Sequence, residues 1–206
     1  MGLAVAAGLR VGLAQGLIHR DIKPANILLA ADGAVKIVDL GLAVVQMGTV
    51  EGSPNPPAMG SARHGLAAPD ASAPGDLPAE PPLGKPTVVG TYGYMSPEQA
   101  ADPERVDFRS DVYSLGVTLY EAATGSLPFS ARDPARCLEQ HRTQPVPPPE
   151  SRAPGIPAAL SALLVAMLAK RPEDRPPSYE ALEAALRRVL DTPAADSAQQ
   201  PRSIQP

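Results

Sequence analysis

The most informative segment of this 206-residue chain lies near its N-terminus and reads His19-Arg20-Asp21-Ile22-Lys23-Pro24-Ala25-Asn26-Ile27-Leu28-Leu29. Its first half is polar and contains a proline, which favours a loop. Its last three residues are apolar and suit a short strand. Asp32-Gly33 follows, a dipeptide typical of hairpin turns. We therefore predict that residues 27–29 and 35–38 pair as a small two-stranded ribbon.

Apolar periodicity predicts helices on both sides of this ribbon. Residues 1–18 are apolar around much of a helical circumference, which indicates a mostly buried helix. Residues 110–123 fit a buried helix that ends at Gly125. Residues 156–169 fit another, with Pro157 at an early position.

One more helix, an amphipathic one, is predicted over residues 179–190. The side chains that we expect to face the core are Leu182, Ala185, Leu186 and Leu190. Residues 191–206 are polar and rich in proline and glutamine, so they predict a disordered tail.

Residues 51–86 differ in kind from the rest of the chain. They hold nine prolines and five glycines, with few large apolar side chains. Such a stretch cannot bury enough surface to offset its ordering entropy, so it predicts a disordered insertion. A passive spacer is favoured over a docking segment, although its prolines suit extended conformations. One folded domain is therefore predicted over residues 1–190, interrupted by this insertion.

Composition and charge narrow the class of protein. A net charge of −4 offers no basic surface for nucleic acid. Cys137 is the only cysteine and cannot form an internal disulfide, which fits a reducing cytoplasm. No apolar run is long enough to span a bilayer. Arg10 interrupts the apolar N-terminal stretch, so a helix entering a core is favoured over a secretion signal. We expect a cytoplasmic location.

Asp21 and Asn26 have the spacing of a protein-kinase catalytic loop, which reads His-Arg-Asp followed by Asn five residues after the Asp. Lys23, two residues after the Asp, gives the serine/threonine-kinase form of this loop. The segment therefore resembles the catalytic loop of that family. A single aspartate such as Asp21 could simply cap a turn. The resemblance to a kinase therefore depends on the motifs that follow.

Later motifs appear in the order of the family. Asp39-Leu40-Gly41 resembles the Asp-Phe-Gly motif with Leu in place of Phe. Residues 90–99, Gly-Thr-Tyr-Gly-Tyr-Met-Ser-Pro-Glu-Gln, resemble the substrate-binding loop and the Ala-Pro-Glu motif. Residues 111–116 match the buried helix that comes next, and Arg175-Pro176 matches a late arginine. The resemblance is strongest to bacterial serine/threonine kinases and covers residues 1 to about 190.

The resemblance implies a mainly α (α+β) fold, the C-terminal lobe of a protein kinase, whose small β ribbon carries the catalytic and metal-binding loops. It also implies phosphoryl transfer to protein substrates that bear Ser or Thr hydroxyls. Asp21 would accept or orient the hydroxyl proton, and Lys23 would neutralise charge on the γ-phosphate. Thr91 would bridge these two side chains.

The implied cofactors are ATP and Mg²⁺. Asn26 and Asp39 would supply the oxygen ligands that magnesium prefers. Leu28 would form part of the surface under the adenine ring. The expected cofactor-binding residues are Lys23, Asn26, Leu28 and Asp39.

Other motif residues are expected to be structural. Glu98 would pair with Arg175 and tie the substrate loop to the late helices. Asp111 would hold the backbone of the catalytic loop through its amides. His19 would join the hydrophobic spine behind the site.

The remaining motif residues concern that spine and regulation. Leu40 would join the same spine as His19, and Gly41 completes the metal-binding motif. Arg20 would bind a phosphorylated activation loop. Thr87 is the preferred phosphorylation site and Thr91 the second. The alternative is that Arg20 only pairs with a local acid.

A working kinase also needs a Gly-rich loop, a strand lysine and a helical glutamate, all in the N-lobe. None of these motifs occurs in the 206 residues, since only twenty residues precede Asp21. We therefore expect a C-lobe whose N-lobe is missing, which alone is inactive and exposes an apolar face that a partner could cover. The readings left open are a kinase with its N-lobe outside this sequence, a noncatalytic binding or decoy module, and a nonfunctional remnant.

Overall fold

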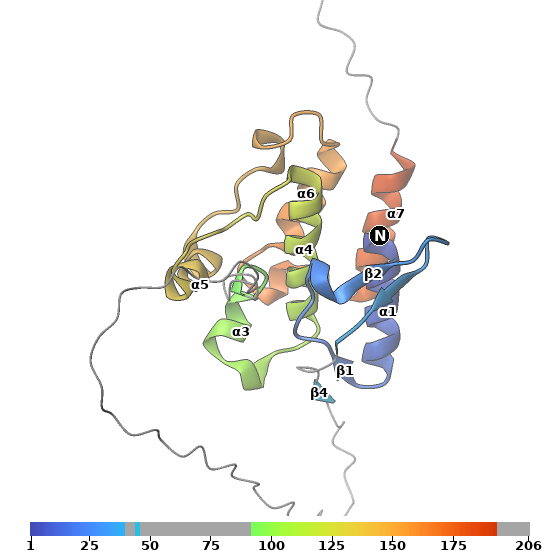
Figure 1. Ribbon diagram of the computed structural model, residues 1–206, viewed down its shortest axis with the longest axis horizontal. Helices are drawn as coiled ribbons and strands as arrows, with labels where there is room; N and C mark the ends of the chain where they lie inside the picture. The colour runs from blue at the N-terminus through green and yellow to red at the C-terminus, as the bar shows by residue number, and fades with distance from the viewer. Residues whose placement is uncertain (40–43, 46–91, 193–206) are drawn as a thin grey trace, which may run out of the picture. The chain divides into compact units, whose positions relative to one another are not determined.

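The computed structural model describes residues 1–39, 44–45 and 92–192 (Figure 1). The α-helices are α1 (Gly2–Ala14), α3 (Pro97–Ala101), α4 (Arg109–Thr124), α5 (Pro134–Thr143), α6 (Ala158–Met167) and α7 (Tyr179–Asp191). The strands are β1 (Leu17–Ile18), β2 (Ile27–Leu29), β3 (Val35–Ile37) and β4 (Val44–Val45). Short 3-10 helices occur at η1 (Pro24–Asn26), η2 (Pro103–Arg105), η3 (Pro149–Ser151) and η4 (Pro172–Asp174). The mainly helical architecture with a small sheet agrees with the predicted fold class.

The predictions for the 51–86 insertion and for the tail beyond Thr192 lie outside the described residues. The same holds for the motif residues Leu40, Gly41, Thr87 and Thr91. No helix in the described ranges is long and apolar enough to cross a membrane.

The predicted ribbon is confirmed. Strands β2 and β3 pair antiparallel, with Ile27 opposite Ile37. The turn between them contains Gly33, whose φ of 84° lies in the left-handed region that glycine adopts without steric cost. Asp32 Oδ1 accepts from the Ala34 amide at 2.9 Å and stabilises the turn. Residues 24–26 precede β2 and Asp39 follows β3, so both lie at the same end of the ribbon, opposite the turn.

Helix α1 is shorter than predicted. It ends at Ala14, because Gly16 adopts a left-handed φ of 75° that turns the chain out of the helix. Leu17 and Ile18 then form β1, which pairs antiparallel with β4. The apolar pattern over 1–18 therefore covers a helix and a strand, both buried in part. Their boundary is set by the backbone conformation of Gly16, which an apolar pattern does not reveal.

Helix α4 carries the centre of the fold. Every residue from Ser110 to Thr118 is buried, as the sequence predicted for this helix. The helix ends at Gly125, which has a left-handed φ of 75° and donates its amide to the Glu121 carbonyl at 2.8 Å. A Cβ at Gly116 would lie 2.8 Å from the Met167 side chain, so the absence of a side chain lets α4 approach α6 closely.

The last two helices depart slightly from the prediction. Helix α6 starts after Pro157 and ends at Met167, two residues short of the predicted end. In α7, Leu190 was predicted to face inward but is 72% exposed. Helical geometry explains the error, because Leu190 lies about 80° around the helix from buried Leu182, whereas Val189 lies only about 20° away. Val189 packs against the core instead.

Two helices were not predicted. Helix α5 has a weak apolar pattern, so the only sequence signal for it is at its N-terminus. There Asp133 accepts from the amides of Ala135 and Arg136, and Pro134 occupies the first turn. Helix α3 is a five-residue helix that starts at Pro97. Both lie close to the substrate-loop segment.

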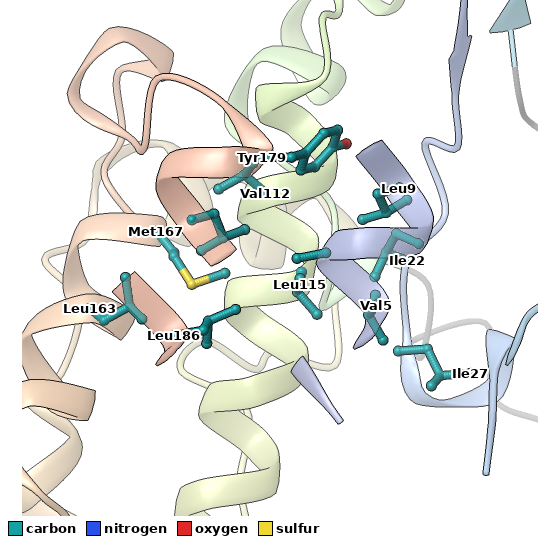
Figure 2. Close-up of a cluster of buried hydrophobic side chains, with 12 residues drawn as sticks. Val5, Leu9, Ile22, Ile27, Val112, Leu115, Leu163, Met167, Tyr179 and Leu186 are labelled. Atoms are coloured by element: carbon teal, nitrogen blue, oxygen red, sulfur yellow. The ribbon is translucent and has the colours of Figure 1, made fainter. Parts of the chain in front are cut away.

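The hydrophobic core joins α1, α4, α6 and α7. Figure 2 shows Val5 and Leu9 of α1 facing Leu115 of α4, with Met167 of α6 and Leu186 of α7 on the other side. Helices α1 and α7 pack side by side, as do α4 and α6 (Figure 1). This core fixes α4, which in turn positions the catalytic loop.

Candidate active site

The catalytic-loop side chains Asp21, Lys23 and Asn26 form one hydrogen-bonded cluster. Lys23 Nζ lies 2.7 Å from Asp21 Oδ2. Asn26 Nδ2 donates to the same oxygen at 2.9 Å and to the Asp21 carbonyl at 2.8 Å. Within the described ranges both side-chain contacts to the carboxylate use Oδ2, and neither uses Asp21 Oδ1 or Asn26 Oδ1. One oxygen of the Asp21 carboxylate is therefore held by the Lys23 and Asn26 side chains.

The Asp39 segment is tied to this cluster by the backbone. The Val38 amide donates to the Asn26 carbonyl at 2.9 Å. His19 Nε2 lies 3.2 Å from the Val38 carbonyl, while His19 Nδ1 accepts from the Asp21 amide at 3.3 Å. These two roles require the tautomer with its proton on Nε2. Asp39 itself has a φ of 64°, which is uncommon for a residue with a side chain and occurs often at functional sites.

Asp111 supports the loop from below. It is 1% exposed, and its Oδ2 and Oδ1 accept from the amides of His19 at 2.9 Å and Arg20 at 2.7 Å. Burial raises the pKa of this carboxyl, and the two amide hydrogen bonds oppose the shift. Tyr179 also donates to Oδ2 at 3.4 Å. The loop backbone is therefore anchored to α4, 92 residues along the chain from His19.

Glu98 and Arg175 form a bidentate ion pair. Arg175 Nη1 and Nη2 lie 2.6 Å and 2.8 Å from the two Glu98 oxygens. The Arg175 side chain is fully buried and that of Glu98 is 19% exposed. The pair ties α3 to the segment that precedes α7, because two parallel N–H···O bonds fix both position and orientation.

The substrate-loop segment beside α3 is anchored to α4 by contacts that sequence reasoning missed. Tyr94 donates its hydroxyl to Glu121 Oε2 at 2.5 Å. Ser114 Oγ donates to the Tyr94 carbonyl at 2.8 Å. Burial, followed by the Glu121 hydrogen bond, raises the pKa of Tyr94. The only available signal was the presence of Tyr94 inside the 90–99 motif.

A small pocket lies between this segment and the catalytic loop. Its lining residues are Arg20, Asp21, Ile22, Tyr94, Met95, Gln99 and Ser114. Asp21 therefore lies on the wall of this pocket.

Arg20 and Leu28 flank the cluster in the sequence. Arg20 has a φ of 66°, and its buried Nε has no hydrogen-bond partner in the described part of the chain. Leu28 is 51% exposed and neighbouring Leu29 is 63% exposed. Leu28 and Leu29 are consecutive in β2, so their side chains point to opposite faces of the ribbon. The exposed Leu28 side chain is suited to lie against one face of a flat apolar ring.

Asn26 and Asp39 offer an amide oxygen and a carboxylate oxygen at the same end of the ribbon, where the Val38 amide donates to the Asn26 carbonyl. The described ranges contain no group of three or more His, Cys, Asp or Glu that could hold a metal ion. Magnesium does not need such a group, since it keeps several waters and takes one or two carboxylates together with substrate phosphates. The donor set present is therefore chemically suited to Mg²⁺.

Comparison with known proteins agrees with this geometry. Residues 2–186 match the family model described as the protein kinase domain, so the chain belongs to the protein kinase domain family. It is 38% identical over 175 residues to the serine/threonine-protein kinase PknB of Mycobacterium tuberculosis (strain ATCC 25618 / H37Rv), an alignment that covers 85% of this chain and 23% of that protein.

A second relative is the serine/threonine-protein kinase PknH of Mycobacterium bovis (strain ATCC BAA-935 / AF2122/97). It is 33% identical over 201 residues, which cover 94% of this chain and 27% of PknH. The chain thus spans about a quarter of the length of the curated relatives that it matches. The bacterial serine/threonine-kinase resemblance found in the motifs is confirmed.

Proposed function

We propose that this chain supplies the catalytic and substrate-binding loops of a serine/threonine protein kinase, which transfers the γ-phosphate of ATP to Ser or Thr hydroxyls of protein substrates. The observation that carries the proposal is the cluster of Asp21, Lys23 and Asn26, in which one carboxylate oxygen is held by two donors. Family membership over residues 2–186 supports it.

Asp21 is the residue that acts on the substrate hydroxyl. Its Oδ2 is neutralised by Lys23, and Oδ1 accepts the hydroxyl hydrogen and orients the attacking oxygen. Lys23 lies close enough to share its charge with a transferring phosphoryl group, which stabilises the negative charge that develops. The proposed role of Thr91, bridging Asp21 and Lys23, concerns a residue outside the described ranges.

Asn26 Oδ1 and the Asp39 carboxylate would hold Mg²⁺, and Leu28 would lie against the adenine ring of ATP. Bound Mg²⁺ supplies charge neutralisation on the phosphate oxygens. Asn26 is already oriented for this task, because its Nδ2 is fixed by Asp21 and its Oδ1 points elsewhere.

Arg20 is the proposed contact for a phosphorylated activation loop, since its guanidinium contains a buried Nε without a partner in the described ranges. Thr87 is the preferred phosphorylation site, followed by Thr91; both lie outside the described residues.

Asp21→Asn tests the proposal directly. In the natural polypeptide, at whatever length the source cell makes it, we expect phosphate transfer to fall at least about a thousandfold while the fold persists, because an amide cannot accept the proton. Phosphate incorporation from labelled ATP and circular dichroism measure the two properties.

The matched control is Asp191→Asn, which makes the same chemical change at the exposed end of α7. It should leave transfer unchanged. Retained turnover in Asp21→Asn would overturn the role given to Asp21.

A noncatalytic binding module is the second candidate. The exposed Leu28 and Leu29 favour it, since a partner that covers them would bury apolar surface. The Asp21 cluster favours the kinase, because a module that only binds has no need of a charged carboxylate held by Lys23.

A further inference from the structure

Gln99 makes a contact with the catalytic loop that none of the motif roles above explains. It lies in α3 directly after Glu98, and its Nε2 donates to the carbonyl oxygen of Arg20 at 2.7 Å. That carbonyl belongs to the peptide bond joining Arg20 to Asp21. No other donor reaches this oxygen within residues 1–39, 44–45 and 92–192.

Arg20 is also held from the other side of its backbone, by α4. The Arg20 amide donates to Asp111 Oδ1 at 2.7 Å. Arg20 has a φ of 66°, and a residue with a side chain keeps such a conformation only where its surroundings impose it. Asp111 and Gln99 therefore act together, one on the amide and one on the carbonyl, to fix the backbone that precedes Asp21.

The Gln99 carboxamide is itself oriented. Ser110 Oγ donates to Gln99 Oε1 at 3.3 Å, which directs Nε2 to the opposite side, toward Arg20. Ser110 is buried and shares a second hydrogen bond of 2.6 Å with Ser96. The helix that carries Gln99 is anchored through the Glu98–Arg175 pair, so the position of the Gln99 backbone is fixed.

We propose that Gln99 is a positioning residue for phosphate transfer, which holds the Arg20–Asp21 peptide so that the Asp21 carboxylate faces the substrate hydroxyl. Gln99 also lines the pocket shared by Asp21 and Tyr94, so one side chain links the substrate-loop helix to the catalytic aspartate. This role rests on the proposed kinase function, and it adds to that function a residue that sets the geometry of the base.

Two substitutions in the natural polypeptide separate positioning from simple stability. Gln99→Leu keeps the approximate volume and removes the donor at every pH. Gln99→Glu keeps the shape, but its carboxylate has no hydrogen at pH 8 and regains one when protonated. A carboxyl beside a carbonyl oxygen is easier to protonate, since the charged form is disfavoured there.

We expect kcat to fall about tenfold in both variants at pH 8, because small displacements of a catalytic group are costly. The KM for Mg-ATP should change less than about twofold, since nucleotide contacts are retained. The ratio of Gln99→Glu activity to wild-type activity should rise as pH falls from 8 to about 5.5. The corresponding ratio for Gln99→Leu should stay flat.

Gln144→Ala is the matched control, because Gln144 is exposed and, within the described ranges, forms a hydrogen bond through its backbone alone. This variant should behave as wild type. An unchanged kcat in Gln99→Leu, or parallel pH profiles for the two Gln99 variants, would overturn the proposal.

Amide hydrogen exchange on residues 1–206 gives a readout that needs no activity. In Gln99→Leu the amides of Arg20, Asp21 and Ile22 should exchange at least about fivefold faster, while those of α7 keep their rates. Unchanged exchange at Arg20 and Asp21 would reject the contact. If the wild-type polypeptide transfers no phosphate, the proposed function fails, and this exchange comparison still decides whether Gln99 holds the peptide.

Discussion

Among single residues, Arg175 shows how one buried side chain holds several segments. To residues that the structure describes it makes five hydrogen bonds, two to Glu98 and one each to the carbonyls of Ala169, Arg109 and Lys170. Arg175→Ala leaves a largely buried carboxylate and three carbonyls without their donor. We therefore expect the free energy of unfolding to fall by about 3–5 kcal/mol, measured by urea denaturation of residues 1–206.

Arg171→Ala is the control for this prediction. The Arg171 side chain is 72% exposed and pairs with Glu173, which is 53% exposed, so its loss should not move the unfolding midpoint measurably. A midpoint for Arg175→Ala that equals that of Arg171→Ala would mean that the buried pair contributes no net stability.

The site residues differ in how far sequence alone could find them. Glu98, Arg175 and Asp111 were named from family motifs, and their side chains make close contacts across more than 60 residues of sequence. The Gln99–Arg20 and Tyr94–Glu121 contacts were not foreseen. A motif specifies residue types at fixed spacing, whereas the direction of a glutamine or tyrosine side chain depends on the helix that packs beside it.

At the scale of elements, α5 is linked to α4 by a buried histidine that predicts a pH dependence. His141 is completely buried, its Nδ1 lies 2.9 Å from the Tyr113 hydroxyl, and Lys170 Nζ donates to its carbonyl at 2.7 Å. Burial, followed by the charge of Lys170, lowers the pKa of His141 to about 4. The unfolded chain therefore takes up this proton more readily than the folded chain between about pH 6.5 and pH 4.

Folding stability must then decrease as pH falls through that window. From pH 7 to pH 5 we expect His141 to account for a loss of about 2 kcal/mol in the free energy of unfolding. His141→Gln keeps an acceptor for Tyr113 and cannot titrate. The carboxylates titrate in both proteins, so their contributions to the unfolding free energy cancel when the two are compared. Urea midpoints that fall equally in wild type and His141→Gln would contradict this assignment.

Element boundaries were the weaker part of the sequence prediction. The ribbon, α4 and α7 were found because turn residues and apolar spacing agree there, whereas α1 was extended past the left-handed Gly16. Helix α5 was missed because it buries only Cys137 and His141, and neither residue makes a readable apolar stripe. Helix α5 therefore forms because of how it packs against the rest of the fold, and not because of an apolar periodicity in its own sequence.

For the molecule as a whole, the motifs specified the family and the core explains why they come together. Helices α1, α4, α6 and α7 share one apolar cluster (Figure 2). Asp111 of α4 accepts hydrogen bonds from the catalytic-loop amides of His19 and Arg20. The order of the motifs along the chain could be read from sequence. Their convergence could not be derived from spacing, because His19, Asp111 and Tyr179 meet only through helix packing.

A polypeptide limited to residues 1–206 should bind Mg-ATP weakly or not at all. Nucleotide in this family is enclosed between two lobes, and these residues contain no Gly-rich loop and no strand lysine for the phosphates. Leu28 and Leu29, on the strand beside the catalytic loop, are 51% and 63% exposed, so a nucleotide there would bury only one face. Isothermal titration of the purified polypeptide should show no saturation at millimolar Mg-ATP. Micromolar binding would show that the catalytic loop and ribbon form a sufficient nucleotide site. An immunoblot of the source cells against residues 191–206 is the companion measurement. A band larger than a 206-residue polypeptide supports the kinase proposal, and a band of the size of 206 residues supports the binding module.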